Sequence, residues 1–317
     1  MRKAALVYNP VSGGSKERQK DLESALAVLR RGGIEADLLP TDSPEHALEE
    51  TRRSIESGCD TIFACGGDGT VHNLVQVVAN SPAALGVLPL GTANALAHNL
   101  GVPLKLDAAA KASLQSTPRR IALGYVKYSD LNGKPGTRYF IVAAGVGVDA
   151  HLFYKLHAGT KQRMGMAAYY AKAWHLWFSY PMTRFVAEYS QVGSNDAYRA
   201  EVTELLAVRI RNFGGILQEL APGASLDRND MRLVFCRTAS RWAYLAYVTR
   251  GLLRLRTTIS GIDLAHSTSV YCSYRVLSNQ LSEQRKIYIE ADGELLGTLP
   301  AQITVQPNAL TLLTPSR

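Results

Sequence analysis

The feature that most constrains this chain is the pentapeptide GGDGT at residues 66–70. It follows an apolar run at residues 60–65 and precedes residues 71–78, whose apolar positions have helical spacing. Glycines let backbone N–H groups approach a phosphate closely, and the start of a helix favours an anion. An acidic side chain in such a loop repels phosphate unless a divalent cation lies between them, so Asp68 is a candidate for organising Mg²⁺ on a nucleotide. The alternative is a tight strand–helix turn with Asp68 as its N-cap.

Two further loops have the same character. NPVSGG at residues 9–14 and PLGTAN at residues 89–94 also follow strand patterns and precede helical ones. Because the carboxyl ends of parallel strands lie at one edge of a sheet, we expect the three loops to converge there. The chain contains neither GxxxxGK[ST] nor GxGxxG, so this phosphate site is of a different type from either.

The first third of the chain alternates between strand and helix patterns. Strands are predicted at residues 3–8, 35–39, 60–65 and 84–88, and helices at residues 16–31, 43–57, 71–78 and through residue 98. Strands that alternate with helices of this length indicate βαβ units and a parallel sheet.

Beyond about residue 120 the pattern changes to many strands with few helices. Strands are predicted at residues 121–128, 138–146, 183–189, 199–211, 231–236, 267–274, 286–291 and 302–305, and helices at residues 163–177 and 241–253. This favours an antiparallel sheet or sandwich. The predicted fold class is α/β: a doubly wound parallel domain over residues 1–123, then an antiparallel β-sandwich domain over residues 124–317, with the option that the last strand returns to the first domain.

Composition narrows the class of protein. A hydrophobic content of 46% excludes general disorder. The sequence has no continuous run of about 18 apolar residues, so no membrane span is predicted. The four cysteines are far apart with no CxxC pair, which suits a reducing cytosol. The apolar run at residues 4–8 is too short for a signal peptide. A net charge of +8 indicates an anionic partner: nucleic acid, nucleotide phosphate or an anionic bilayer.

The ordered set of motifs resembles the diacylglycerol kinase catalytic family. It comprises NPVSGG, GGDGT, PLGTANALA, RNFGGILQELAPGASLD at residues 211–227 and ADGE at residues 291–294. In length and motif order the chain is most similar to the bacterial soluble lipid kinases, which include sphingosine and phosphatidylglycerol kinase relatives. GGDGT alone is shared with NAD kinases and, more loosely, with phosphofructokinases. The ordered combination is more specific, and the resemblance extends from about residue 3 to residue 315.

The resemblance implies an α/β nucleotide domain and a β-sandwich domain, with ATP in the cleft and a lipid hydroxyl as the phosphate acceptor. The family's ATP contacts map onto Asn9, Ser12, Gly13, Gly14, Thr41, Gly66, Gly67, Asp68, Gly69, Thr70, Thr92 and Asn94. The residue after Asn94, often acidic in the family, is here Ala95. No carboxylate is therefore available at that position.

The late motif Asp292-Gly293-Glu294 matches the place where the family has its proton acceptor, the glutamate. Phosphoryl transfer to an alcohol needs a base within hydrogen-bond reach of the hydroxyl, and a strand that ends in a glycine turn is a rigid support for one. The candidate catalytic residues are Glu294, Asp68 and Asp292. The alternative for Asp292 and Gly293 is an ordinary hairpin turn.

Residues 221–231 match a loop that often holds a second, structural Mg²⁺ in the bacterial relatives. Here Asp227 is followed by Arg228, and a guanidinium does not ligate Mg²⁺. Asp230 with the carbonyl of Ser225 is one possible ligand set; the other possibility is that Arg228 replaces the metal by pairing with Asp227 or Asp230. We favour the replacement, and predict a metal-free loop in an enzyme that still needs Mg²⁺ for catalysis.

The function predicted from these features is an ATP- and Mg²⁺-dependent lipid kinase acting at the cytoplasmic face of a membrane. The alternatives are an NAD kinase-like activity and a catalytically silent lipid- or nucleotide-binding module. The expected partners are a lipid substrate and an anionic membrane surface, with no nucleic acid, and a homodimer is an open option. Basic residues that could face the bilayer are Lys16, Arg18, Lys20, Lys155, Lys161 and Arg163.

Overall fold

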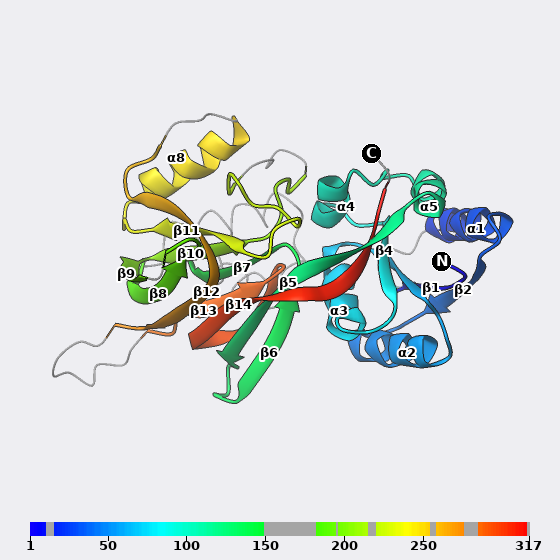
Figure 1. Ribbon diagram of the computed structural model, residues 1–317, viewed down its shortest axis with the longest axis horizontal. Coiled ribbons are helices and arrows are strands. Elements are labelled where there is room, and N and C mark those ends of the chain that lie inside the picture. The colour runs from blue at the N-terminus through cyan, green and yellow to red at the C-terminus, as the bar shows by residue number, and fades with distance from the viewer. Residues whose placement is uncertain are drawn as a thin grey trace. The chain divides into compact units, whose positions relative to one another are not determined.

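The chain of the computed structural model divides into two units, each built from several segments (Figure 1). The structure describes residues 1–10, 16–148, 182–194, 196–214, 220–253, 258–275 and 285–315. The first unit consists of Met1–Leu123, Asn212–Leu217 and Gln306–Arg317, and the second of Gly124–Arg211 and Gln218–Val305. The helix predicted at residues 163–177 lies outside the described residues.

Four parallel strands form the sheet of the first unit in the order β2-β1-β3-β4. They are β1 (Lys3–Tyr8), β2 (Glu35–Pro40), β3 (Thr61–Gly66) and β4 (Ala84–Pro89). The end of β14 (Glu294–Thr314) joins this sheet, because Thr311 and Leu312 pair in parallel with β4.

Helices cover both faces of that sheet. They are α1 (Lys16–Arg31), α2 (Pro44–Glu56), α3 (Asp68–Val78), α4 (Ala95–Leu100) and α5 (Leu106–Leu114). α1 packs against α5, and α2 packs against α3. Figure 1 shows the first pair on one face and the second pair on the other. The doubly wound arrangement predicted from the sequence is confirmed.

Burial explains why β3 is a fixed support for the loop that follows it. Ile62, Phe63 and Ala64 are fully buried. The ring of Phe63 occupies space that β4 leaves open at Gly86, where a Cβ atom would lie 2.4 Å from Phe63 Cε1. A close-packed strand of this kind holds the GGDGT loop in a defined position at its carboxyl end.

The second unit is mostly antiparallel, as predicted. Its strands are β5 (Thr117–Ser129), β6 (Pro135–Phe140), β7 (Ala143–Gly147), β8 (Phe185–Gln191), β9 (Ala197–Val202), β10 (Glu204–Val208), β11 (Met231–Cys236), β12 (Ile262–Tyr274), β13 (Tyr288–Ala291) and the first part of β14. Within the sheet the order is β13-β7-β10-β11-β12-β8-β9. β5 and β14 each contain residues of both units.

The two faces of β11 contact different parts of the unit. Met231, Leu233 and Phe235 face the main hydrophobic core of the unit. Cys236, of the opposite parity, packs with Tyr244 of helix α8 (Arg241–Leu252). Because side chains alternate along a strand, Arg232 lies on this second face as well.

One predicted strand is in fact two. The run predicted at residues 199–211 is interrupted at Thr203, between β9 and β10. The backbone N–H of Thr203 donates to Cys236 O at 2.8 Å, and its hydroxyl donates to Thr238 O at 2.8 Å. These bonds fix the backbone of Thr203 between the two strands. β9 therefore pairs with β8, whereas β10 pairs with β11.

In the part of the chain that the structure describes, no helix is both long enough and apolar enough to cross a bilayer.

Candidate functional site

The carboxyl edge of the parallel sheet gathers most of the predicted nucleotide contacts. Asn9 follows β1, Thr41 follows β2, Gly66–Thr70 span the end of β3, and Thr92 and Asn94 follow β4. Ser12, Gly13 and Gly14 lie outside the described residues. The nucleotide contacts themselves stay a prediction.

The GGDGT loop and the PLGTAN loop are in direct contact. A Cβ atom on Gly91 would lie 2.4 Å from the Cα of Gly67, so the two backbones approach as closely as only glycine allows. The backbone N–H of Leu90 also donates to Gly66 O at 2.9 Å. The predicted convergence of the loops is thus confirmed for these two.

Asp68 connects the same two loops through its side chain. It is the first residue of α3, whose N-cap is Gly67, so the alternative of Asp68 as the N-cap is wrong. Its Oδ1 accepts a hydrogen bond of 2.7 Å from the backbone N–H of Ala95, the first residue of α4. The carboxylate therefore lies at the start of two helices at once, where both helix dipoles favour a negative charge.

Asn94 and Thr41 make bonds that shape their own loops. The side chain of Asn94 accepts from Gly91 N at 3.0 Å and donates to Gly91 O at 2.8 Å, and its φ of 48° is left-handed. Thr41 is buried and donates to Tyr8 O from both its backbone N–H and its hydroxyl, at 2.8 and 3.2 Å. Thr92, between these bonded residues of the second loop, is exposed.

In the second unit, Asp292 holds the turn between β13 and β14 in place. Its Oδ1 accepts from the backbone N–H groups of Val142 and Ala143 at 2.8 and 3.1 Å, and its Oδ2 accepts from that of Ile141 at 3.0 Å. Its own N–H donates to Ala143 O at 2.8 Å. With φ of 49° at Asp292 and 85° at Gly293, the turn is tight and left-handed. These contacts favour a positioning role for Asp292.

Glu294 follows this turn as the first residue of β14, where it pairs with Ala291 and is half-buried. A second glutamate supports the turn from the other side: buried Glu290 accepts from Gly293 N at 2.8 Å through Oε2. Glu290 lies opposite Gly145 on β7, where a Cβ atom would come within 2.8 Å of Oε1. Sequence reasoning missed Glu290, although a single charge in the apolar run IYIEA was a signal for it.

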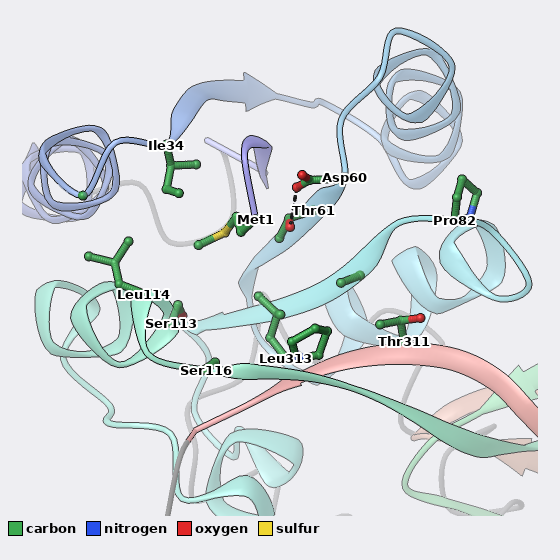
Figure 2. Close-up of a pocket in the computed structure, with 13 residues that line it drawn as sticks. Met1, Ile34, Asp60, Thr61, Pro82, Ser113, Leu114, Ser116, Thr311 and Leu313 are labelled. Atoms are coloured by element: carbon green, nitrogen blue, oxygen red, sulfur yellow. Dashed lines mark hydrogen bonds between the residues drawn. The ribbon is translucent and has the colours of Figure 1, made fainter.

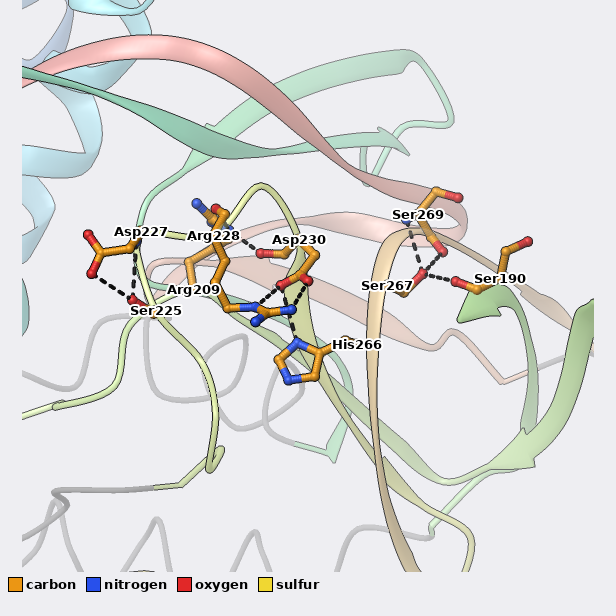
Figure 3. A network of polar contacts seen from close by, with 9 residues as sticks. All are labelled: Ser190, Arg209, Ser225, Asp227, Arg228, Asp230, His266, Ser267 and Ser269. Carbon is orange, nitrogen blue, oxygen red and sulfur yellow. Dashed lines mark hydrogen bonds and ion pairs between the residues drawn. The ribbon is translucent and has the colours of Figure 1, made fainter. Parts of the chain in front are cut away.

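The loop at residues 225–230 contains the predicted ion pair (Figure 3). Arg228 Nε donates to Asp230 Oδ1 at 2.7 Å, and its Nη2 bonds the other carboxylate oxygen. Ser225 instead bonds Asp227, accepting from its backbone N–H at 3.1 Å. The pairing of Arg228 with Asp230 is therefore observed, and the absence of a metal from this loop stays a prediction.

A cavity of about 510 Å³ lies at the opposite edge of the parallel sheet (Figure 2). Its lining includes Ile34, Thr61 and Ala84, each at the amino end of a strand. Since the strands are parallel, this cavity and the glycine loops lie at different edges of the sheet. The cavity is therefore separate from the candidate phosphate site.

Comparisons with known proteins agree with these observations. The model of the diacylglycerol kinase catalytic domain matches residues 3–126. A diacylglycerol kinase of Bacillus subtilis is 28% identical over 306 residues, covering 95% of this chain and 93% of that protein. One of Staphylococcus haemolyticus is 27% identical over 319 residues, covering 99% of this chain and 89% of that protein.

Solved structures extend the likeness to the whole fold. A diacylglycerol kinase structure from Bacillus anthracis superimposes with a TM-score of 0.66 at 17% identity, covering 99% of this chain and 96% of that one. Yeast NADH kinase, complexed with NADH, gives a TM-score of 0.53 at 10% identity, with 100% and 84% covered. At these identities the likeness establishes the fold alone.

Proposed function

We propose that this chain, which belongs to the diacylglycerol kinase catalytic domain family, transfers the γ-phosphoryl group of ATP to a hydroxyl of diacylglycerol or a related lipid. The family is one of lipid kinases that use ATP. The observation that carries the proposal is the contact of Gly67 with Gly91 and of Asp68 with Ala95, which fixes two phosphate-type loops together.

In the first unit, the proposed task is to hold the nucleotide. Backbone N–H groups of the glycine loops and the amino ends of α3 and α4 are suited to phosphate oxygens. Asp68 fits a divalent cation, because a carboxylate is a hard oxygen ligand and this one lies in the glycine loop itself, at the start of α3 and beside α4. A bound Mg²⁺ would neutralise charge on the β- and γ-phosphates.

In the second unit, the proposed task is to activate the acceptor. The lipid hydroxyl oxygen forms a bond to the γ-phosphorus, the bond from that phosphorus to the bridging oxygen of ADP breaks, and the hydroxyl proton passes to Glu294. Asp292 and Glu290 keep the turn before Glu294 in a fixed conformation through their bonds to backbone N–H groups. A rigid support of this kind favours catalysis, because a displaced base loses its alignment with the hydroxyl.

The lipid substrate places the proposed reaction at a membrane surface. The net charge of +8 supports a peripheral association with anionic lipid at the cytoplasmic face. Of the basic residues considered for this, Lys155, Lys161 and Arg163 lie outside the described residues.

The test is transfer of radiolabelled γ-phosphate to diacylglycerol, monoacylglycerol, phosphatidylglycerol, sphingosine and NAD. We expect a labelled lipid, and a loss of roughly 10²–10⁴ in kcat for Glu294→Gln with ATP affinity nearly unchanged. Glu188→Gln, which removes an exposed glutamate of the same unit paired to Arg199, is the matched control and should retain full activity.

Each alternative has its own outcome in this screen. Labelled NAD without labelled lipid would instead favour an NAD kinase-like activity. Binding of ATP without transfer to any acceptor would indicate a silent binding module. Full activity of Glu294→Gln would remove Glu294 as the base while leaving the lipid kinase intact.

A further inference from the structure

Helix α8 of the second unit exposes an apolar stripe that the proposed reaction does not use. Among the described side chains of the helix and its C-cap, the exposed ones are Trp242, Ala246, Thr249 and Leu253. They stand at i, i+4, i+7 and i+11, and positions with this spacing lie along one side of a helix. Figure 1 shows α8 at the outer margin of the second unit. We call these four residues the α8 stripe.

The two large side chains of the stripe are the most exposed of their kind. Trp242 is 70% and Leu253 is 63% exposed, and no other large hydrophobic residue that the structure describes exceeds 51%. Eleven residues separate them, which is about 16 Å along a helix axis. Single exposed hydrophobic residues are common on protein surfaces, whereas two of this size on one line of a helix indicate a surface that a partner covers.

Helix α2 of the first unit shows the usual pattern. Its exposed residues include Glu45, Glu49, Arg52 and Glu56, which also stand at i, i+4, i+7 and i+11, and all four are charged. In contrast, α8 has no aspartate, glutamate or lysine at any position. The same line that carries charges on α2 therefore carries apolar side chains on α8.

The opposite face of α8 is already used for packing. Tyr244 is buried against Cys236 and Val148. Tyr247 is also buried, and its hydroxyl donates to Leu220 O. Because α8 would lose these contacts if it turned about its axis, the stripe is held on the outer side of the helix.

The segment that carries the stripe is basic. Residues 237–262 include five arginines and no aspartate or glutamate. Arg237 is balanced by Asp263, with its Nη1 3.1 Å from the carboxylate. Arg241, the first residue of α8, is partly exposed and directly precedes Trp242. An apolar stripe with an arginine at its end suits a partner that is apolar inside and anionic at its surface.

We propose that the α8 stripe docks the chain on an anionic lipid bilayer. Trp242 and Leu253 enter the boundary between headgroups and acyl chains, and Arg241 lies at the level of the lipid phosphates. Tryptophan suits this boundary because its ring is apolar and its N–H is polar. The axis of α8 then lies parallel to the membrane surface, as in other amphipathic interfacial helices. The inference rests on the proposed function in one respect, since a lipid acceptor is presented by a bilayer.

A second copy of the chain fits the stripe less well than a bilayer does. A twofold contact through α8 would place the same basic segment on both sides of the interface. Like charges that face each other across an interface oppose association, whereas anionic headgroups attract them.

The test is sedimentation of the full chain with vesicles of phosphatidylcholine, with and without phosphatidylserine, a lipid that is not among the candidate acceptors. Trp242→Ser should lower the partition coefficient on the mixed vesicles by about tenfold, because the burial of a large apolar side chain is lost. Leu253→Ser should lower it in the same direction. The matched control is Leu104→Ser, which removes an exposed leucine of the first unit and should bind as the wild type does.

Equal binding of Trp242→Ser and the wild type overturns the proposal, as does a wild type that does not bind the mixed vesicles. Equal binding of the wild type to both kinds of vesicle also overturns it, since the proposed partner is anionic. If Trp242→Ser fails to fold by circular dichroism, Leu253→Ser is judged by the same criterion. Sedimentation equilibrium without vesicles tests the other occupant: a wild-type dimer that Trp242→Ser dissociates would assign the stripe to a second copy and overturn the proposal.

A second arm separates this proposal from the proposed kinase reaction. Sedimentation needs no turnover, so Glu294→Gln should bind vesicles as the wild type does. Trp242→Ser should keep its transfer rate on a short-chain diacylglycerol dissolved as monomers, and lose about tenfold on diacylglycerol in mixed vesicles at limiting vesicle concentration. Vesicle binding that depends on Trp242 without any lipid phosphorylation would overturn the proposed function alone. Lipid phosphorylation with unchanged vesicle binding of Trp242→Ser would overturn the docking surface alone.

Discussion

Two aspartates that stand beside glycines, Asp68 in the first unit and Asp292 in the second, make different contacts in similar surroundings. Asp68 accepts a bond from the backbone N–H of Ala95, at the start of α4 after the neighbouring loop. Asp292 accepts three, through both of its oxygens, from three consecutive residues. Both follow a strand, yet the Asp68 bond joins two loops of the glycine-rich edge, whereas the Asp292 bonds hold the turn between β13 and β14 against the start of β7.

The difference shows how a scaffolding carboxylate differs from one that can serve chemistry. The three charge-assisted hydrogen bonds of Asp292 tie its carboxylate to the backbone of residues 141–143, so a change of its position would break several bonds at once. The carboxylate of Asp68 lies at the start of two helices beside the glycine loops, where a nucleotide phosphate and its cation are expected to bind. We therefore expect Asp68 to act on the nucleotide and Asp292 to act through the conformation of its turn.

The largest effect should follow from Asp68→Asn. The amide keeps an oxygen for the N–H of Ala95, so the fold should change little, but the charge that holds Mg²⁺ on ATP is lost. We expect the transfer rate to fall by at least about 10²-fold, a loss typical for removal of a group that stabilises transition-state charge. ATP affinity in the presence of Mg²⁺ should also fall, as measured by equilibrium binding.

The control for Asp68→Asn is the same binding measurement in EDTA. Without the metal, the variant and the wild type should bind ATP with similar affinity. If the variant also keeps wild-type ATP affinity in Mg²⁺, then Asp68 is only a connector between the two loops, and the contrast with Asp292 disappears.

Asp292→Asn should have its main effect on stability. Asparagine tolerates the left-handed φ of 49°, so the backbone conformation is retained. An amide has only one acceptor oxygen, so at least one of the three buried N–H groups loses its partner. We expect the free energy of unfolding in urea to fall by about 2–3 kcal/mol. A change below about 0.5 kcal/mol, the usual range for surface substitutions, would show that the clamp contributes little.

The comparison also shows what sequence reasoning can and cannot reach. The parallel strands and their loops were predictable, because each strand and the helix after it are encoded locally by apolar spacing and glycine. The contacts of Asp292 were not, since its partners lie 149 to 151 residues earlier in the chain. Nor was the break at Thr203, which depends on bonds to Cys236 and Thr238 across the sheet.

The same limit applies to the polar groups of the second unit. A pairing of Arg228 with Asp227 or Asp230 was predictable, because these residues lie within two positions of it in the chain, and the structure shows the pair with Asp230. The placement of Arg232 opposite His266 depends on the register between β11 and β12, which no local pattern states. In the candidate site, the glycine loops could be predicted as a group, whereas the bond from Ala95 to Asp68 could not.

Asp230→Asn extends the comparison to a carboxylate bonded by side chains. The folded-state pKa of Asp230 lies below the unfolded value of about 3.9, so its charged form stabilises the fold above that pH. We expect the variant to be less stable by about 2 kcal/mol at pH 7, as one partner of a half-buried pair is removed. The difference should shrink as the pH falls through the lowered pKa.

That dependence is measured by urea unfolding of both proteins between neutral and acidic pH. Wild-type stability should approach that of the variant only at the acidic end, because both side chains are then uncharged. A difference that stays constant across the whole range would mean that the charge of Asp230 contributes nothing to the free energy of unfolding. The loop would then be held by the side chain of Arg209, whose Nη1 donates to the backbone oxygens of Arg228 and Asp230.

The smallest effect should come from Ser43→Ala in the first unit. This variant measures how much stability a single uncharged hydrogen-bond acceptor contributes. Ser43 is the N-cap of α2, and its hydroxyl oxygen accepts from His46 N at 3.2 Å. Loss of this cap should lower the free energy of unfolding by about 1 kcal/mol, with no change in transfer rate. Asp68→Ala also loses a bond from a backbone N–H, so we compare the two variants. The comparison separates the stability that one hydrogen bond contributes from the effect of the charge of Asp68 on the transfer rate. If both substitutions cost the same stability and leave the rate intact, Asp68 is a cap like Ser43, and the two aspartates do not differ as proposed.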